Sequence, residues 1–351
     1  MTKQPKRIVW AYDELQNLSD ASMASAPDLF GREISLANVA EAPQRDIILP
    51  VCYRNTPWAL TLAHALGFGL FRESHIVQHF DDPSMWEEIG YQVEHGSLTE
   101  GETVTLSRAP RSYPTIFTEL LDPADAVAVK AFQSRDEQNV WIADQVKRNI
   151  TEDELDPDDI LIILPNAISA KDEYYALRRH LDSYGISSNL AGVTNDRDSF
   201  METGAVTVSG IFRAKGNEAP MVYIANADHC ASGHEMIRLR NVLFTGITRS
   251  RCWVRICGIG QGMATLQKEI DQVTSRDFKL RFRIPTSPEL EKVRRINRDR
   301  TAQEKGQIRK AARNLEEVIE LVRQGVLSPD AMPQLRELLR ALKEGGERDE
   351  R

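Results

Sequence analysis

Short apolar runs alternate with amphipathic segments along most of the chain. Residues 159–164 read DILIIL, and a continuous apolar run of this length is typical of a strand buried on both faces of a parallel sheet. In residues 136–148, Val140, Ala143 and Val146 recur near one face, which predicts an amphipathic helix. Similar patterns predict strands at residues 7–12, 33–36, 46–54, 103–106, 126–132, 206–209, 221–225 and 252–257, and helices at 56–66, 172–184 and 241–245. Strands that alternate with helices predict an α/β fold, with a doubly wound, mostly parallel sheet and helices on both faces.

The composition changes towards the C-terminus. Residues 288–345 are rich in Arg, Lys, Glu and Leu at helical spacing. Two apolar faces, one from Ile308 to Val322 and one from Leu335 to Leu342, are separated by Ser328-Pro329-Asp330. This pattern predicts a helical hairpin followed by a charged, disordered tail from Gly345.

Composition narrows the class of protein. The 351 residues carry a net charge of −8, so any contact with nucleic acid must be local. The four cysteines are scattered without CxxC spacing, and no apolar run is long enough to span a bilayer, which together favour a reducing, cytoplasmic setting. The group His229, Cys230 and His234 lacks a fourth ligand at the spacing of a metal site.

Acidic residues follow the first apolar run. Asp13 and Glu14 come directly after residues 7–12. Such a pair can hold Mg²⁺ with one carboxylate and activate a water with the other. The other interpretation is a pair of solvated acids in an acidic chain.

Three further segments place polar groups at the ends of predicted elements. Tyr53 and Arg54 end an apolar run and offer a flat ring and a cation. The stretch 209–220, SGIFRAKGNEAP, links two predicted strands, and its Gly216 permits a close backbone approach. Arg249 and Arg251 lie where a predicted helix gives way to a strand, and the planar fork of an arginine matches phosphate oxygens. Taken singly, each of these groups is equally well read as a surface side chain.

Taken in order, these segments resemble the motifs of UvrD-like superfamily 1 helicases. Asp13-Glu14-Leu15-Gln16 resembles motif II, and Tyr53-Arg54 resembles motif IV. Residues 212–218 resemble motif V, and Thr248-Arg249 resembles motif VI. The resemblance covers roughly residues 7–260 and implies that the main body is a second RecA-like domain.

The resemblance implies a role for each matching residue. Asp13 is expected at Mg²⁺, Glu14 as the base for the attacking water, with Gln16 nearby. Tyr53 is expected to stack on adenine, Arg54 to meet the γ-phosphate of ATP, and Arg249 to be the arginine finger, with Arg251 as a supporting partner. Further expected contacts are Glu218, Gly216 and Lys215 with the nucleotide, and Phe212, Arg213 and Thr248 with nucleic acid.

The chain also departs from the family's pattern. No G-x-x-x-x-G-K-[ST] sequence, the P-loop that cradles phosphates, occurs anywhere in the 351 residues. Motif III is not recognisable between Leu18 and Arg45, and Phe212 replaces the usual histidine of motif V. The span 184–206 is too short for the large accessory domain of UvrD-like enzymes. We therefore expect negligible ATPase activity from the isolated chain, and a strand at 7–12 that is unpaired, disordered or docked on another chain.

These departures leave two interpretations. In the first, the chain is the C-terminal portion of an ATP-dependent helicase or translocase, and a P-loop partner chain or a missing N-terminal region completes it. DNA is then the expected substrate, with RNA as the alternative. In the second, it is a non-catalytic binding module on a RecA scaffold. The expected organisation is residues 1–45 as the remnant of a first RecA-like domain, 46–286 as the second with a small insertion near 75–125, and 287–351 as a helical extension and tail.

Overall fold

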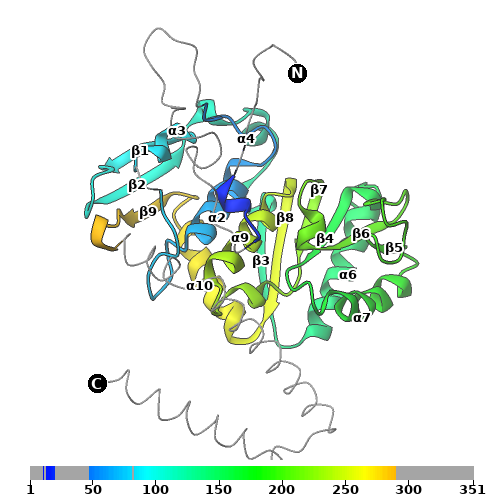
Figure 1. Ribbon diagram of the computed structural model, residues 1–351. Helices are drawn as coiled ribbons and strands as arrows, with labels where there is room; N and C mark the ends of the chain where they lie inside the picture. Colours follow the sequence, from blue (N-terminus) through cyan, green and yellow to red (C-terminus); the bar gives the residue numbers. More distant parts are fainter. Residues whose placement is uncertain (1–10, 12, 20–46, 81–82, 290–351) are drawn as a thin grey trace, which may run out of the picture. The chain divides into compact units, whose positions relative to one another are not determined.

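The computed structural model describes residues 11, 13–19, 47–80 and 83–289 (Figure 1). The predicted strands at 7–12 and 33–36 and the predicted C-terminal hairpin fall almost entirely outside these ranges. They stay predictions, as do the domain boundaries at residues 45 and 286. In the part of the chain that the structure describes, no helix is both long and apolar enough to cross a membrane.

A six-stranded parallel sheet forms the centre of the described unit, with the strand order β3-β8-β7-β4-β6-β5. Its strands are β3 (Val127–Phe132), β4 (Ile160–Leu164), β5 (Ser188–Leu190), β6 (Val206–Gly210), β7 (Ala219–Ile224) and β8 (Ser250–Ile259). The predicted α/β class with a parallel sheet is confirmed. The three-residue edge strand β5 was not foreseen.

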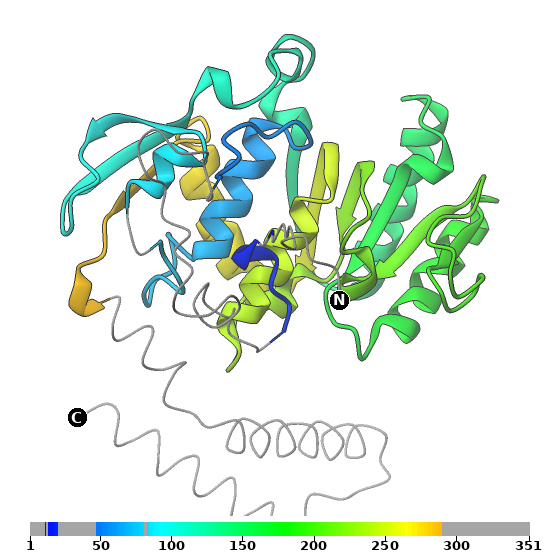
Figure 2. The same ribbon diagram turned by 45° about the horizontal axis from the view of Figure 1, so that its top comes forward.

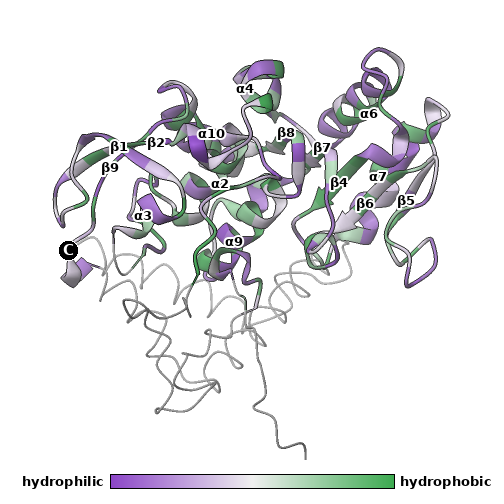
Figure 3. Cartoon of the chain, turned by 90° about the horizontal axis from the view of Figure 1, so that it is seen from above, coloured by the Kyte–Doolittle hydropathy of each residue, from purple (hydrophilic) through white to green (hydrophobic). Residues whose placement is uncertain are grey.

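Helices cover both faces of this sheet (Figure 2). One face packs on α2 (Pro57–Phe68), α9 (Met236–Ile247) and α10 (Gly260–Thr274), and the other on α6 (Arg135–Thr151) and α7 (Ala170–Ser183). Along β4, Leu161 and Ile163 join the first apolar cluster, whereas Ile160, Ile162 and Leu164 join the second. Because alternate side chains point to opposite faces of a strand, a strand buried on both faces must be apolar throughout. Figure 3 shows the resulting hydrophobic colour along β4, whereas β8 also carries hydrophilic residues.

A second, antiparallel sheet has the order β1-β2-β9. It joins β1 (Tyr91–Gly96), β2 (Thr103–Arg108) and β9 (Leu280–Arg283). The predicted strand at 103–106 is confirmed as part of β2, whereas β1 and β9 were not foreseen. The ring of Trp86 packs against the ring of Phe282 on β9 with centroids 5.6 Å apart, and Trp86 is fully buried. The sheet is therefore completed by a strand that lies some 170 residues further along the chain.

The predicted strand at residues 46–54 is wrong. Residues 47–54 form no strand, and Ile47 and Leu49 are 64% and 81% exposed. Pro50 lacks the backbone N–H that a sheet ladder needs, and the segment instead bonds Cys52 N to the carbonyl of Ser112 at 2.9 Å. The segment thus leads into α2 as irregular chain.

Helix α2 follows as predicted. The Thr56 hydroxyl accepts a hydrogen bond from Ala59 N, which caps the start of the helix, and Pro57 occupies its first position. Gly69 ends it in the left-handed conformation, with φ 67°. The remaining short helices are α3 (Met85–Glu88), α4 (Ile116–Leu120), α5 (Pro123–Ala126), α8 (Ile211–Ala214), η1 (Glu14–Gln16), η2 (Pro110–Ser112), η3 (Pro157–Asp159) and η4 (Ala227–Cys230).

Residues 13–19 pack against α9 (Figures 1 and 2). Leu15 and Leu18 are buried in the same apolar cluster as α2 and α9. The side chain of Asn241 on α9 donates a hydrogen bond to Asn17 O at 2.8 Å. The segment that carries Asp13 and Gln16 is therefore held by apolar and polar contacts within this unit.

Candidate functional site

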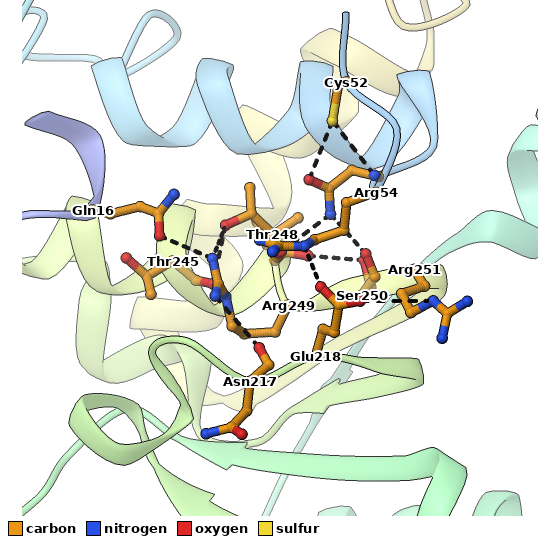
Figure 4. Close-up of polar contacts among 12 residues, drawn as sticks. Gln16, Cys52, Arg54, Asn217, Glu218, Thr245, Thr248, Arg249, Ser250 and Arg251 are labelled. Atoms are coloured by element: carbon orange, nitrogen blue, oxygen red, sulfur yellow. Dashed lines mark hydrogen bonds and ion pairs between the residues drawn. The ribbon is translucent and has the colours of Figure 1, made fainter. Parts of the chain in front are cut away.

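Several of the predicted site residues meet at the amino ends of β7 and β8. Ala219 pairs with Ser250 across these parallel strands, so the residues just before them, Glu218 and Arg249, lie at the same edge of the sheet. Arg54 reaches this edge from the start of α2, and Gln16 reaches it from η1 (Figure 4). Four segments that are far apart in the sequence thus converge.

Arg249 is 1% exposed and is held by four hydrogen bonds. Its Nε donates to Thr245 O at 3.0 Å, a carbonyl in the last turn of α9. The terminal nitrogens donate to Gln16 Oε1 at 2.9 Å, to Thr248 Oγ1 at 3.3 Å and to Asn217 O at 3.4 Å. The guanidinium is therefore fixed from η1, from α9 and from the segment before β7.

The pKa of Arg249 is lowered from 12.5 to about 10, mainly by burial and secondarily by the nearby charge of Arg54, while Glu218 and Asp13 oppose the shift. A group with this pKa remains charged at neutral pH. The chain thus holds a rigid, buried cation, and the neighbouring carboxylates offset part of the free-energy cost of burying its charge.

Glu218 lies between two more cations. Its carboxylate is 2.5 Å from Arg54 Nε and 3.9 Å from Arg251 Nε. Arg54 and Glu218 are each about two-fifths exposed, so solvent and a ligand can reach them. Three arginines therefore gather around one glutamate, which leaves a local positive charge on an acidic chain.

Asp13 and Gln16 form a small polar unit. Asp13 is exposed, and its carboxylate accepts hydrogen bonds from Leu15 N at 3.1 Å and from Gln16 Nε2 at 2.6 Å. The same Gln16 side chain accepts the bond from Arg249, so it links Asp13 to the buried guanidinium. The side chain of Glu14 lies outside what the structure describes. Among the described residues, no group of three or more His, Cys, Asp or Glu is arranged to hold a metal ion.

The residues expected to contact the nucleotide are exposed. Tyr53, beside Arg54, is 77% exposed. Lys215 and Gly216 are exposed as well, and Gly216 has φ +94°, which a side chain rarely adopts. These three residues are therefore accessible to solvent and to a ligand.

The three residues expected to contact nucleic acid are placed differently from one another. Phe212 is 52% exposed and follows the carboxyl end of β6, whereas Arg249 precedes the amino end of the parallel strand β8, so the two lie towards opposite edges of the sheet. Arg213 folds back onto the carbonyls of Arg197 and Ser199. Thr248 is buried, and its hydroxyl donates to Phe244 O at 2.9 Å. In this conformation only Phe212 of the three presents a large free surface.

One residue that the sequence did not single out is Asn55. Its side-chain amide is buried and donates to Thr248 O at 3.2 Å and to Ser250 O at 2.6 Å. These carbonyls flank Arg249. A polar residue next to Arg54 was the only signal in the sequence, and a polar residue before a helix is ordinarily a cap.

A glycine-rich turn, Gly258 to Gly262, lies where β8 passes into α10. In the structure, the side chain of Asp228 lies against this turn. The carboxylate of Asp228 accepts a bond from Ile259 N at 3.0 Å, and Arg135 binds both its oxygens at 2.7 Å. A Cβ on Gly258 would lie 2.5 Å from that carboxylate, so the glycine is needed for internal packing.

Comparison with known proteins agrees with the order of the motifs. Residues 205–257 match the family described as the UvrD-like helicase C-terminal domain. This match covers β6, the segment of residues 212–218, α9, Arg249 and most of β8. No curated protein matches the chain.

Two solved structures are similar over part of the chain. The C-terminal domain of a possible DNA helicase from Lactobacillus plantarum WCFS1 is 22% identical, with a TM-score of 0.29, over 40% of this chain and 79% of that one. The Arterivirus nonstructural protein 10 (helicase) in complex with DNA is 14% identical, with a TM-score of 0.25, over 39% of this chain and 29% of that one. Residues 205–257 are thus similar to the UvrD-like helicase C-terminal domain, and this segment contains Glu218 and Arg249 of the site.

Proposed function

We propose that the chain forms part of an ATP-dependent superfamily 1 helicase or translocase that acts on DNA. In this proposal it supplies phosphate-contacting and Mg²⁺-contacting residues to a P-loop that its own sequence does not contain. The observation that carries the proposal is the convergence of Gln16, Arg54, Glu218 and Arg249 at one edge of the sheet. A scaffold has no physical need for these groups in one place.

The arginines have the chemistry that phosphoryl transfer requires. Such reactions are accelerated mainly by positioning and by neutralising the charge that develops on the transferred group. Arg54 is accessible and its planar fork suits phosphate oxygens, whereas Arg249 is rigid and charged. We assign Arg54 to the γ-phosphate and Arg249 to the role of arginine finger, with Arg251 beside them.

The residues present fit part of an ATP and Mg²⁺ site. Mg²⁺ is commonly bound through one or two carboxylates together with phosphate oxygens and water, and Asp13 offers an exposed carboxylate for this purpose. When bound, the ion would neutralise phosphate charge. Glu14 is proposed as the base for the attacking water. Tyr53 is proposed to stack on adenine, and Glu218, Gly216 and Lys215 to line the nucleotide.

DNA binding is proposed to be local and mostly to phosphates. The net charge of −8 opposes binding over the whole surface. Phe212 offers an exposed ring on which a base can stack, and Arg213 lies next to it. RNA offers the same phosphates and bases, so the choice between the two rests on the family match.

One observation favours the second interpretation, a non-catalytic RecA-fold binding subunit. Arg249 is buried and bonded within the chain, so it must change partners before it contacts a phosphate. Under this interpretation the buried guanidinium only stabilises the junction between α9 and β8.

Reconstitution tests the two interpretations. The chain would be used to capture a P-loop partner from its native source, and ATP hydrolysis by the purified assembly would be compared for wild type, Arg249→Lys and the surface control Arg148→Lys. Loss of an arginine finger costs roughly 10³ to 10⁵ in rate in related reactions. Arg148 pairs with Glu152 on an exposed helix turn, so its variant should behave as wild type. Full turnover by the Arg249→Lys assembly would overturn the proposal.

A further inference from the structure

The side chain of Asn55 donates hydrogen bonds to the backbone carbonyls on both sides of Arg249. Its Nδ2 donates one hydrogen bond to Thr248 O at 3.2 Å and one to Ser250 O at 2.6 Å. Asn55 is 4% exposed, so water does not compete for these carbonyls. A primary amide has two N–H donors, and here both are used on one short stretch of chain.

The other end of Asn55 is held as well. Its backbone N–H donates to Cys52 Sγ at 3.5 Å, and its Oδ1 lies 3.6 Å from the same sulfur. The residue therefore closes a tight loop over Cys52 to Asn55. This loop contains Tyr53 and Arg54, which point outwards while Asn55 points inwards.

The backbone from Thr248 to Ser250 joins α9 to β8, and its carbonyls need hydrogen-bond donors from other segments. Thr248 caps the end of α9 and Ser250 begins β8, so their carbonyls lie where a helix ladder stops. The carbonyl between them, on Arg249 itself, accepts a bond from Ala219 N at 3.1 Å. All three successive carbonyls are thus held, two of them by Asn55.

We propose that Asn55 is a positioning residue that couples Arg54 to Arg249. Arg54 directly precedes Asn55, and the short amide side chain sets the separation between the two segments that carry the cations. This inference rests on the proposed function for its biological meaning. Its physical content, that Asn55 controls the placement of Arg249, is independent of it.

The test is the chemical reactivity of individual arginines in the full chain. Phenylglyoxal would be applied and modified arginines identified by mass spectrometry, in wild type, Asn55→Asp, Asn55→Ser and the control Asn149→Ala. Arg54 and Arg251 are accessible and should react in every protein, whereas Arg249 should be protected in wild type. Asn149 is a buried asparagine that forms hydrogen bonds with Tyr223 and Asp153. Asn149→Ala therefore controls for the loss of a buried amide at a site away from Arg249.

We expect labelling of Arg249 to rise about tenfold in Asn55→Asp, because the loss of one or two hydrogen bonds changes a local opening equilibrium by about that factor. Asn55→Ser keeps one donor and should give a smaller rise, and Asn149→Ala should give none. Unchanged protection of Arg249 in both Asn55 variants would overturn the proposal. An equal rise at Arg240, which is fully buried elsewhere, would also overturn it, because Asn55 would then only stabilise the fold.

The labelling experiment tests the positioning role of Asn55, and ATP turnover of the assembly separately tests the helicase proposal. If Asn55→Asp exposes Arg249 but Arg249→Lys leaves turnover of the assembly unchanged, the positioning role stands and the catalytic role fails. If Arg249 stays protected in both Asn55 variants while Arg249→Lys abolishes turnover, the catalytic role of Arg249 stands and the positioning role of Asn55 fails.

Discussion

Gln16 and Arg249 are 233 residues apart in the sequence, and the Gln16 Oε1 atom accepts a hydrogen bond from Arg249 Nη2 at 2.9 Å. The amide nitrogen of the same Gln16 side chain donates to Asp13 at 2.6 Å. This single side chain therefore joins the acidic segment at the start of the chain to the buried cation at the end of α9. The proposed Mg²⁺-contacting and phosphate-contacting groups are linked through it.

Gln16→Ala should loosen residues 13–19. The variant removes a hydrogen bond to a charged group, which is typically worth about 1.5–3 kcal/mol, and leaves Leu15 and Leu18 as the main anchors. We expect amide exchange in residues 13–19, measured by mass spectrometry, to become at least about tenfold faster. Gln261→Ala, on the exposed start of α10, is the control. Unchanged exchange in Gln16→Ala would show that the apolar contacts alone hold the segment.

Glu218→Gln should strengthen the binding of inorganic triphosphate. The Glu218 carboxylate lies 2.5 Å from Arg54 Nε. Removing its charge leaves the Arg54 guanidinium free to bind phosphate. Because both groups are substantially exposed, the gain is modest, about two- to fivefold in affinity by titration calorimetry. Glu152→Gln removes the same charge from an exposed pair with Arg148 and should have no effect. Weaker ATP binding with unchanged triphosphate binding would instead assign Glu218 to the ribose.

Acid should destabilise the fold through His64. Burial, and secondarily the charge of Arg108, lowers the pKa of His64 from 6.5 to about 3, so the folded protein keeps this ring neutral. The unfolded chain takes up a proton below pH 6.5, and the stability from His64, fully present above that pH, is lost progressively down to about pH 3. Between pH 7.5 and 5.5 this loss amounts to about 1.4 kcal/mol.

Urea unfolding at these two pH values measures the effect. His64→Gln keeps an acceptor for the Tyr91 hydroxyl, which lies 2.9 Å from His64 Nδ1, and should show a smaller difference between the two pH values. His95→Gln, at an exposed position, should retain the wild-type difference. An identical pH dependence in His64→Gln and wild type would assign the acid sensitivity to other groups.

Removal of one partner of the buried ion pair between Arg240 and Glu269 should strongly destabilise the fold. Two hydrogen bonds of 2.8 and 2.7 Å join these side chains, which connect α9 to α10. Glu269→Gln leaves a buried guanidinium without its counter-charge and should cost about 3–5 kcal/mol in urea unfolding. Glu152→Gln at an exposed pair should cost under about 1 kcal/mol. Equal effects of the two variants would contradict this account.

For Arg249→Ala, the sequence and the structure give different expectations. From the sequence, truncation of Arg249 is expected to leave the fold intact, because a cation near a phosphate site is usually pictured at a surface. The structure buries the guanidinium and gives it four acceptors. Truncation would leave several of these acceptors unpaired, so Arg249→Lys is the better test of function.

The local pattern of the sequence by itself determined the main elements and their class. Continuous apolar runs such as residues 160–164 predicted buried parallel strands, because only a strand covered on both faces needs apolar residues throughout. The order of four short motifs also predicted the family that residues 205–257 match. These signals are contained in residues close together in the chain.

Only the tertiary structure decided which distant residues meet. No local pattern shows that β9 completes the sheet of β1 and β2, or that Asn55 reaches the carbonyls beside Arg249. Strand order, register and the burial of a polar side chain depend on packing between segments far apart in sequence. For that reason the arginines could be named from the sequence, but their partners could not.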